Sequence, residues 1–376
     1  MGLRLALRLG CAIAPALGVY LLVPHVGYLH DGQRYSQLAS HPFDNRVGTP
    51  WSLRIGVPLL VHLSPFSQPI SFYGLAFVSL AATGLSVAAV VSQLGLSEAH
   101  ACAAATLACS SELTAISFWS YYIDVEVLAL YALTLWLASR RQAAWPLIPI
   151  VGLGVIVKEI VLLAAPLALL VWGRGRRYFV TSAAALAAGA LVYIVEVKTL
   201  PTKGYLSGIN ATSSNGRVLR TQWSDTTTWL RAIGEIGVVR YSGNAILSVF
   251  GVAWILWLPG WRAAPPWLRR AQWWVLLSLP LFITAQWERT FAFYLPLTVP
   301  LAMLGARAWE RRELVLLVAG SVWISAFVPT RTIADDRVTH ALTKLAWMSP
   351  GFAAAAIAIW LSATHVHPRA QQRIRG

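Results

Sequence analysis

A single carboxylate stands in the first polar stretch of an otherwise apolar amino-terminal region. Asp31 lies in the segment from Tyr28 to Tyr35, just past the expected end of the first helix. A carboxylate that is wet on one side and apolar on the other is partly desolvated, which raises its proton affinity and suits it to act as a general base. Asp31 is equally suited to cap a short helix with Gly32 and Arg34 following it. Spacing alone leaves both interpretations open.

Lys158 and Glu159 interrupt the apolar run from Val151 to Leu170. Charges at membrane depth are costly, so such residues face the interior of a helix bundle or a water-filled cavity. Lys158 and Glu159 therefore indicate a functional site. The alternative is that both are interfacial anchors whose side chains extend to the membrane surface.

Arginines with the geometry to hold a phosphate occur at three further places. Arg289 follows Glu288 between two apolar runs, Arg54 precedes Ile55-Gly56-Val57-Pro58, and Arg217 lies in a long polar segment. The planar guanidinium fork matches phosphate oxygens. A Trp/Arg interface anchor at Arg289 and a solvated loop at Arg217 are the alternatives.

Two acidic residues, Asp124 and Glu126, open another apolar run after Trp119, Tyr121 and Tyr122. Carboxylates are favourable in the first turn of a helix because of the helix dipole, so a polar helix start is the simpler interpretation. The histidines show no spacing typical of a zinc site. The acidic pair Asp335 and Asp336 could hold a divalent ion such as Mg or Mn, but a solvated turn is the simpler interpretation, so no metal is assigned.

The composition is that of an integral membrane protein. Of the 376 residues 57% are hydrophobic and only 12% are charged, whereas soluble domains carry about 25% charged residues. The net charge of +15 comes largely from arginines in short clusters between apolar runs. Such clusters are typical of cytoplasmic loops and form no continuous basic face, so we exclude a nucleic-acid partner.

The apolar runs predict an all-α, polytopic bundle of about twelve transmembrane helices, with residues 1–376 as one transmembrane domain. Two runs, 145–157 and 159–172, are too short to span upright and are expected to be a broken or re-entrant pair. The predicted helices are 5–24, 69–92, 99–118, 121–138, 145–157, 159–172, 178–198, 243–259, 271–287, 290–305, 314–329 and 345–364.

An even number of spans places every arginine cluster and both termini on the cytoplasmic side. Two long loops, 25–68 and 199–242, are then non-cytoplasmic. In the second loop, the segment from Asp225 to Val239 is predicted to be an interfacial helix, with Trp229, Ile233 and Ile236 on one face. We expect a multi-pass protein of the inner (cell) membrane with its active site on the periplasmic or extracellular side.

Four short motifs in this order resemble the GT-C fold family of integral membrane glycosyltransferases, which use polyprenyl-phosphate sugars as donors. They are Asp31-Gly-x-x-Tyr35, Arg54-Ile-x-x-Pro58-Leu-Leu, Lys158-Glu159, and Glu288-Arg289 with the following Pro296. The resemblance covers the helix layout and these motifs. His30 precedes Asp31 where many members carry a second acid, and the next acid is Asp44.

The resemblance implies an inverting transfer of a sugar from a polyprenyl-phosphate donor to a hydroxyl acceptor. Asp31 is then the general base. Lys158, Arg289, Arg54 and Arg217 are candidates to bind the donor phosphate. The residues implied to orient these groups or bind the sugar are Glu159, Glu288, Tyr35 and Asp124. The implied partners are the lipid-linked donor, a glycan, lipid or protein acceptor, and membrane lipid.

Three other functions are compatible with the same residues. A transporter or flippase of a lipid-linked glycan needs the groove and the charges without a chemical step. A non-catalytic membrane assembly subunit needs no base at Asp31. Membrane acyl transfer usually needs a reactive histidine, and His25 and His30 lie near Asp31.

Overall fold

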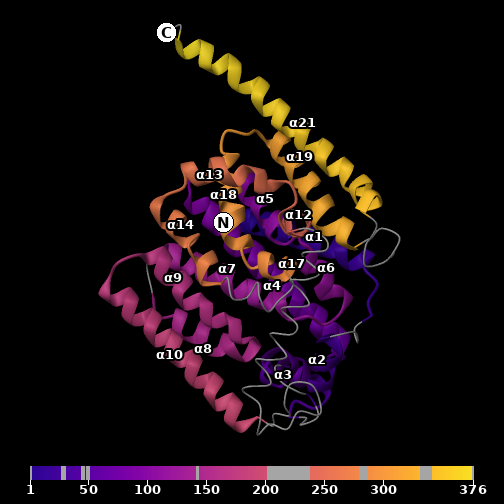
Figure 1. The fold of residues 1–376 in the computed structure, drawn as a ribbon, viewed down its shortest axis with the longest axis vertical. Helices are drawn as coiled ribbons and strands as arrows, with labels where there is room; N and C mark the ends of the chain where they lie inside the picture. Colours follow the sequence, from indigo (N-terminus) through magenta and orange to yellow (C-terminus); the bar gives the residue numbers. More distant parts are fainter. Residues whose placement is uncertain are drawn as a thin grey trace.

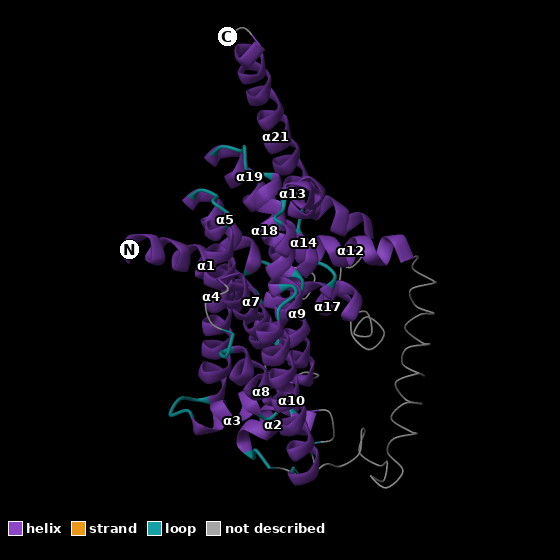
Figure 2. Ribbon diagram, turned by 90° about the vertical axis from the view of Figure 1, so that its left-hand side faces the viewer, coloured by secondary structure: helices purple, strands orange, loops and turns teal. Residues whose placement is uncertain are grey.

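The computed structural model describes residues 2–26, 31–43, 47, 51–140, 144–200, 238–278, 287–330 and 341–374. In this part of the chain the regular elements are all helices, and no strand occurs among them (Figure 2). The predicted all-α class is therefore confirmed.

Five helical segments are long and apolar enough to cross a membrane, judged by length and composition. They are α1 (Gly2–Leu22), α4 (Gln68–Gln93), α10 (Arg176–Thr199), α19 (Arg311–Val322) with its continuation to Thr330, and the Lys344–Thr364 part of α21 (Ala341–Ile374). A sixth span results if α5 (Glu98–Ala108) and α6 (Glu112–Trp119), which meet at 48°, are counted as one.

The other predicted spans correspond to shorter helices. One is α7 (Asp124–Arg140), which begins three residues after the start of the predicted 121–138. The region from 238 to 305 is divided further than expected, with Gly251 after α12 and Pro265 before α14 at two of the breaks. Its described helices are α12 (Val238–Phe250), η4 (Ala253–Leu256), α13 (Trp257–Ala263), α14 (Pro266–Ala271), α15 (Trp274–Leu277), α17 (Trp287–Ala292) and α18 (Leu295–Gly305).

Helix α4 is central to the bundle and packs against α1, α5 and α7 (Figure 1). Small residues allow the close approach, since Gly84 of α4 lies directly against Ala12 of α1 and Ala105 of α5. On one side of this core α8 packs against α10, and on the other α19 packs against α21.

The two short predicted runs, 145–157 and 159–172, form a hairpin. It consists of α8 (Leu147–Val157), the short η2 (Glu159–Leu163) and α9 (Ala164–Trp172). Leu147 in the first turn of α8 and Trp172 in the last turn of α9 line the same small space against α7, so the chain reverses between them. Lys158 interrupts the helices with extended backbone angles, φ −165° and ψ 135°. The hairpin therefore presents Lys158 and Glu159 at its tip.

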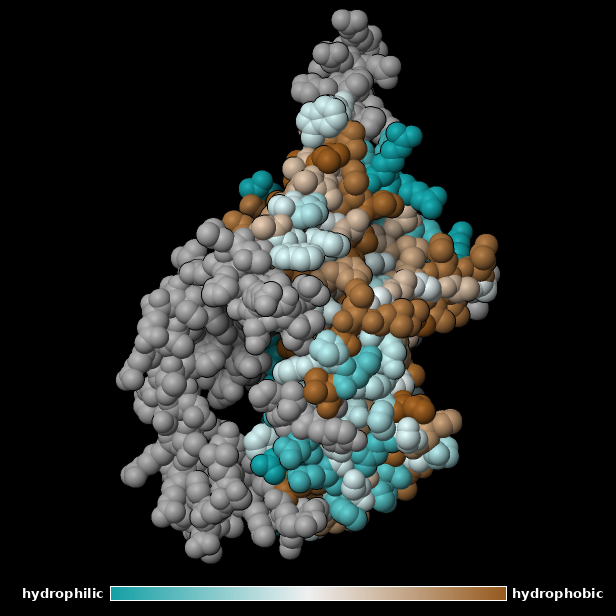
Figure 3. All heavy atoms as spheres, turned by 90° about the vertical axis from the view of Figure 1, so that its right-hand side faces the viewer, coloured by the Kyte–Doolittle hydropathy of each residue, from teal (hydrophilic) through white to brown (hydrophobic). Residues whose placement is uncertain are grey.

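The predicted first outside loop, 25–68, folds into three short helices beside this tip. They are α2 (Asp31–Ser40), η1 (Trp51–Leu53) and α3 (Gly56–Leu63). Gly56 lies against the backbone of Ile156 and Val157, and a Cβ there would come within 3.1 Å of Ile156. This close contact brings Arg54 to the hairpin tip. Hydrophilic side chains gather at this end of the molecule, and hydrophobic side chains dominate the described surface above it (Figure 3).

The arginine-rich loops meet at the opposite end. Arg8 of α1 forms a bidentate ion pair with Glu98 of α5, with both contacts at 2.6 Å. Arg270 of α14 donates to the carbonyls of Leu170 and Val171 at the end of α9. The loops around Leu94, Ala263 and Arg307 line one cavity of about 700 Å³. Most of the second predicted outside loop, with its interfacial helix, lies outside the described residues.

Candidate active site

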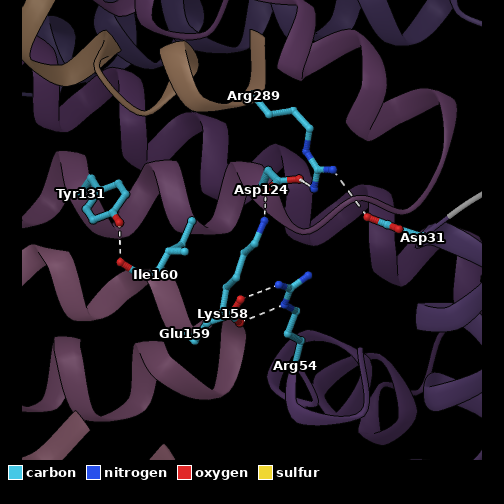
Figure 4. A network of polar contacts seen from close by, with 8 residues as sticks. All are labelled: Asp31, Arg54, Asp124, Tyr131, Lys158, Glu159, Ile160 and Arg289. Carbon is cyan, nitrogen blue, oxygen red and sulfur yellow. Dashed lines mark hydrogen bonds and ion pairs between the residues drawn. The ribbon is translucent and has the colours of Figure 1, made fainter. Parts of the chain in front are cut away.

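Asp124 is the centre of a buried charge network. It is the first residue of α7, where the helix dipole favours a carboxylate, and its side chain is fully buried. Lys158 donates to Oδ1 and Arg289 donates to Oδ2, each at 2.5 Å. A buried carboxylate between two cations retains its charge and fixes both partners. Asp124, predicted as an orienting residue, thus joins two predicted phosphate-binding residues (Figure 4).

Arg289 connects this network to Asp31. Its Nη1 lies 3.5 Å from Oδ2 of Asp31, while its Nη2 is held by Asp124. The Asp31 side chain is 19% exposed, and this contact is too long for a strong hydrogen bond. The Nε of Arg289 is buried and has no hydrogen-bond partner in the described part of the chain. The site therefore contains a loosely held carboxylate beside an arginine with a free donor.

Aromatic rings position the two cations. The guanidinium of Arg289 lies over the ring of Tyr122, 4.8 Å from its centroid, and Nζ of Lys158 lies 6.0 Å from that of Phe293. Such contacts stabilise cations that have lost their water. Tyr131 donates to the carbonyl of Ile160 at 2.5 Å, which ties the hairpin to α7.

A second ion pair lies next to the first network. Arg54 contacts Glu159 in a bidentate manner, at 2.9 and 2.5 Å. Tyr35 is fully buried in α2, within electrostatic range of Arg54, Asp31 and Asp124. Burial raises the pKa of the Tyr35 phenol, so its hydroxyl remains protonated. Lys158 and Glu159 thus bind different partners, as expected for neighbours that point in different directions.

The structure brings together seven of the predicted site residues and leaves two undetermined. Arg217 lies outside the described residues, as do His30, Asp44 and the Asp335–Asp336 pair. The backbone of Glu288 belongs to α17, but its side chain is not described. The residues brought together are Asp31, Tyr35, Arg54, Asp124, Lys158, Glu159 and Arg289.

A metal site is not evident in the described ranges, where no group of three or more His, Cys, Asp or Glu side chains could hold an ion. Asp31 and Asp124 share Arg289 instead. The possible divalent cation therefore stays a prediction.

His25, the candidate for acyl transfer, is held in place by its surroundings. Its Nδ1 lies 3.1 Å from the carbonyl oxygen of Phe118, and its ring packs between Tyr20 and Tyr73. These contacts give His25 a structural role in the packing of the bundle.

Glu196, near the end of α10, is a buried carboxylate that was not among the predicted site residues. The signal was available, because Glu196 is an ionisable residue within an apolar span. Its position close to the end of the run made it resemble an ordinary helix end.

Comparison with known proteins adds no assignment: neither a family model, nor a curated protein, nor a solved structure matches the chain.

Proposed function

We propose that the chain is an inverting glycosyltransferase of GT-C type, which moves a sugar from a polyprenyl-phosphate donor to a hydroxyl acceptor. The observation that carries the proposal is the loosely held Asp31 beside Arg289, whose other arm is fixed by Asp124. With about twelve transmembrane segments, some of them broken, this site faces the non-cytoplasmic side of the cell membrane. The gathering of the arginine-rich loops at the opposite end supports this orientation.

The charge balance of the network suits such a reaction. Lys158 and Arg289 carry two positive charges, and Asp31 and Asp124 carry two negative charges, so the four residues together are neutral. When Asp31 takes the proton of the acceptor hydroxyl, it loses its charge and releases Arg289. At that moment the acceptor oxygen attacks the anomeric carbon, and the bond from this carbon to the phosphate oxygen breaks.

The electron pair of that bond leaves with the lipid phosphate. Arg289 and Lys158 are then in place to stabilise the departing phosphate, and the buried Nε of Arg289 is an additional donor. Because this stabilisation increases as the reaction proceeds, it lowers the transition state more than the bound donor.

A groove for the lipid chain lies next to Arg289. It has a volume of about 420 Å³ and is lined mainly by aromatic side chains, among them Phe250 and Trp257. Phe291 and Tyr294, which follow Arg289 in the chain, also line it. Trp273 and Leu276 at its edge are more than half exposed, so the groove opens to the side. Such an opening allows a lipid to enter from the bilayer with its phosphate at Arg289.

The test is sugar transfer by membranes that contain wild type or Asp31→Asn, with radiolabelled polyprenyl-phosphate mannose, glucose and arabinose as donors. Asparagine has nearly the same shape but cannot act as the base, so we expect transfer to fall by about 10²- to 10⁴-fold. Glu98→Gln is the matched control, since it neutralises an arginine-paired carboxylate at the opposite end. It should retain activity.

Equal transfer by Asp31→Asn and wild type would remove Asp31 from the mechanism. Absence of transfer by the wild type with all three donors would contradict the proposal. It would favour the second candidate, a transporter of lipid-linked glycans, whose supporting observations are the bent pair α5–α6 and the α8–α9 hairpin. Movement of the lipid-linked sugar across proteoliposomes measures that activity directly.

A further inference from the structure

Helix α10 carries a carboxylate on its packed face. The buried residues of this helix are Ser182, Ala185, Gly189 and Glu196. They follow helical spacing, so they form one stripe along the helix. The first three are small and allow close packing against the hairpin, where Gly189 lies against Leu162. Glu196 continues this stripe with a long charged side chain.

The sequence neighbours of Glu196 face outward, away from the hairpin. Ile194, Val195 and Val197 are 43–50% exposed, whereas Glu196 is only 7% exposed. Its side chain therefore points into the molecule rather than toward lipid or water. Figure 1 shows the end of α10 at the same end of the molecule as α2 and α3.

Both carboxylate oxygens of Glu196 are buried and lack a hydrogen-bond partner among the described residues. Burying an unsatisfied carboxyl group is costly, and the other deeply buried site carboxylate, Asp124, has two partners. An unpaired ionisable residue within a membrane span is by default a candidate functional residue. A ligand that supplies hydrogen-bond donors would satisfy Glu196.

The neighbours of Glu196 belong to the candidate active site. Its carboxylate lies within electrostatic range of Glu159, which is paired with Arg54. Tyr193 lies one turn earlier on α10 and interacts electrostatically with Arg54, Glu159 and Glu196. Helix α10 also packs against η1, which directly precedes Arg54, and against η2, which begins with Glu159.

The charges of this cluster restrict the class of ligand. Glu159 and Glu196 outnumber Arg54, so the cluster repels a phosphate. The described residues offer no group of three ligating side chains for a metal ion. What remains is the acceptor carboxylate of Glu196 with the Tyr193 phenol one turn away on the same helix, a pair suited to a neutral group with several hydroxyls.

We propose that Glu196, with Tyr193, binds hydroxyl groups of the donor sugar and thereby selects which sugar is transferred. This inference rests on the proposed glycosyltransferase function. Because Glu159 directly follows Lys158, a donor with its phosphate at Lys158 and Arg289 has its sugar next to this cluster. Glu196 is a specificity-determining residue, distinct from the base Asp31.

The first test is kinetic. Glu196→Gln retains the size of the side chain but replaces a charged acceptor by an amide, which weakens a hydrogen bond from a sugar hydroxyl. We expect kcat/KM for the preferred donor to fall by about 10- to 100-fold. The deoxy donor that lacks the contacted hydroxyl should show no further loss in the variant.

Glu313→Gln is the matched control for this measurement. Glu313 is 1% exposed on α19, at the arginine-rich end of the molecule. This variant should leave the relative rates with different sugars unchanged. Equal sugar selectivity in Glu196→Gln and wild type would overturn the inference. Absence of transfer by the wild type with every donor would contradict the proposed function instead.

A second test does not depend on transfer. Dicyclohexylcarbodiimide, an apolar reagent, reacts with carboxyl groups in apolar surroundings through their protonated fraction, and mass spectrometry locates the modified residue. We expect labelling of Glu196, which a polyprenyl-phosphate sugar prevents and polyprenyl phosphate without a sugar does not. Equal protection by both lipids, protection by neither, or absence of labelling at Glu196 would each overturn the inference.

Discussion

Two regions of the molecule pair arginine with a carboxylate, and they differ in burial and in the number of partners. At one end Arg8 and Glu98 form a bidentate pair whose side chains are 19% and 29% exposed. At the other end Asp124 is fully buried and holds Lys158 and Arg289. The exposed pair retains water as an alternative partner, whereas the buried carboxylate has only its two cations. The same chemical group therefore contributes little at one end and determines the local structure at the other.

The largest effect is expected for Asp124→Ala, because it leaves two buried cations without their carboxylate. We expect the free energy of unfolding to fall by about 3–5 kcal/mol. Thermal unfolding in detergent measures the loss. Adding Lys158→Met should recover part of the stability, since one of the unpaired charges is then removed. A loss no larger than that of Glu98→Ala would contradict the contrast between the two regions.

An intermediate effect is expected for Arg54→Lys. Lysine keeps the positive charge but cannot form both hydrogen bonds to Glu159, so stability should fall by about 1–2 kcal/mol. The matched control is Arg8→Lys, which removes the same bidentate geometry from a pair that lies away from the Asp124 network. Equal losses in both variants would show that the neighbouring network does not strengthen the Arg54 pair.

The smallest effect is expected for Arg8→Ala. A partly exposed ion pair contributes at most about 1 kcal/mol, and salt reduces this contribution. Unfolding measured at low and high salt should therefore show a small difference from wild type that disappears as salt increases. A large loss that is insensitive to salt would place this pair in the same class as the Asp124 network.

The all-α class, the long helices α1, α4 and α10, and most of the residues that come together at the candidate site could be predicted from the sequence. Lys158 and Glu159 stood out because charges are rare inside apolar runs, and the shortness of the two flanking runs predicted the hairpin. Arg54 and Asp31 stood out as charges in a predicted loop that leaves and re-enters the membrane.

The pairing of these residues could not be predicted. Asp31, Asp124, Lys158 and Arg289 come from four distant segments, and which carboxylate meets which cation depends on how the helices pack. Asp124 illustrates the limit, because a carboxylate in a first helical turn is equally consistent with a solvated helix start. Glu196 is a charge in an apolar run that resembles an ordinary helix end in the sequence, and the packing of α10 shows that it points inward.

The turn at Lys158 joins the two ion pairs by a single peptide unit. Lys158 holds Asp124 from the extended residue between α8 and η2, and Glu159, the first residue of η2, holds Arg54. A displacement of Lys158 therefore reaches Glu159 through one peptide unit. Thermodynamic linkage requires any coupling between the two ion pairs to be reciprocal, so a group that weakens one pair by weakening the other is itself affected by the same factor. The tip of the hairpin is thus the shortest covalent connection between the two ion pairs.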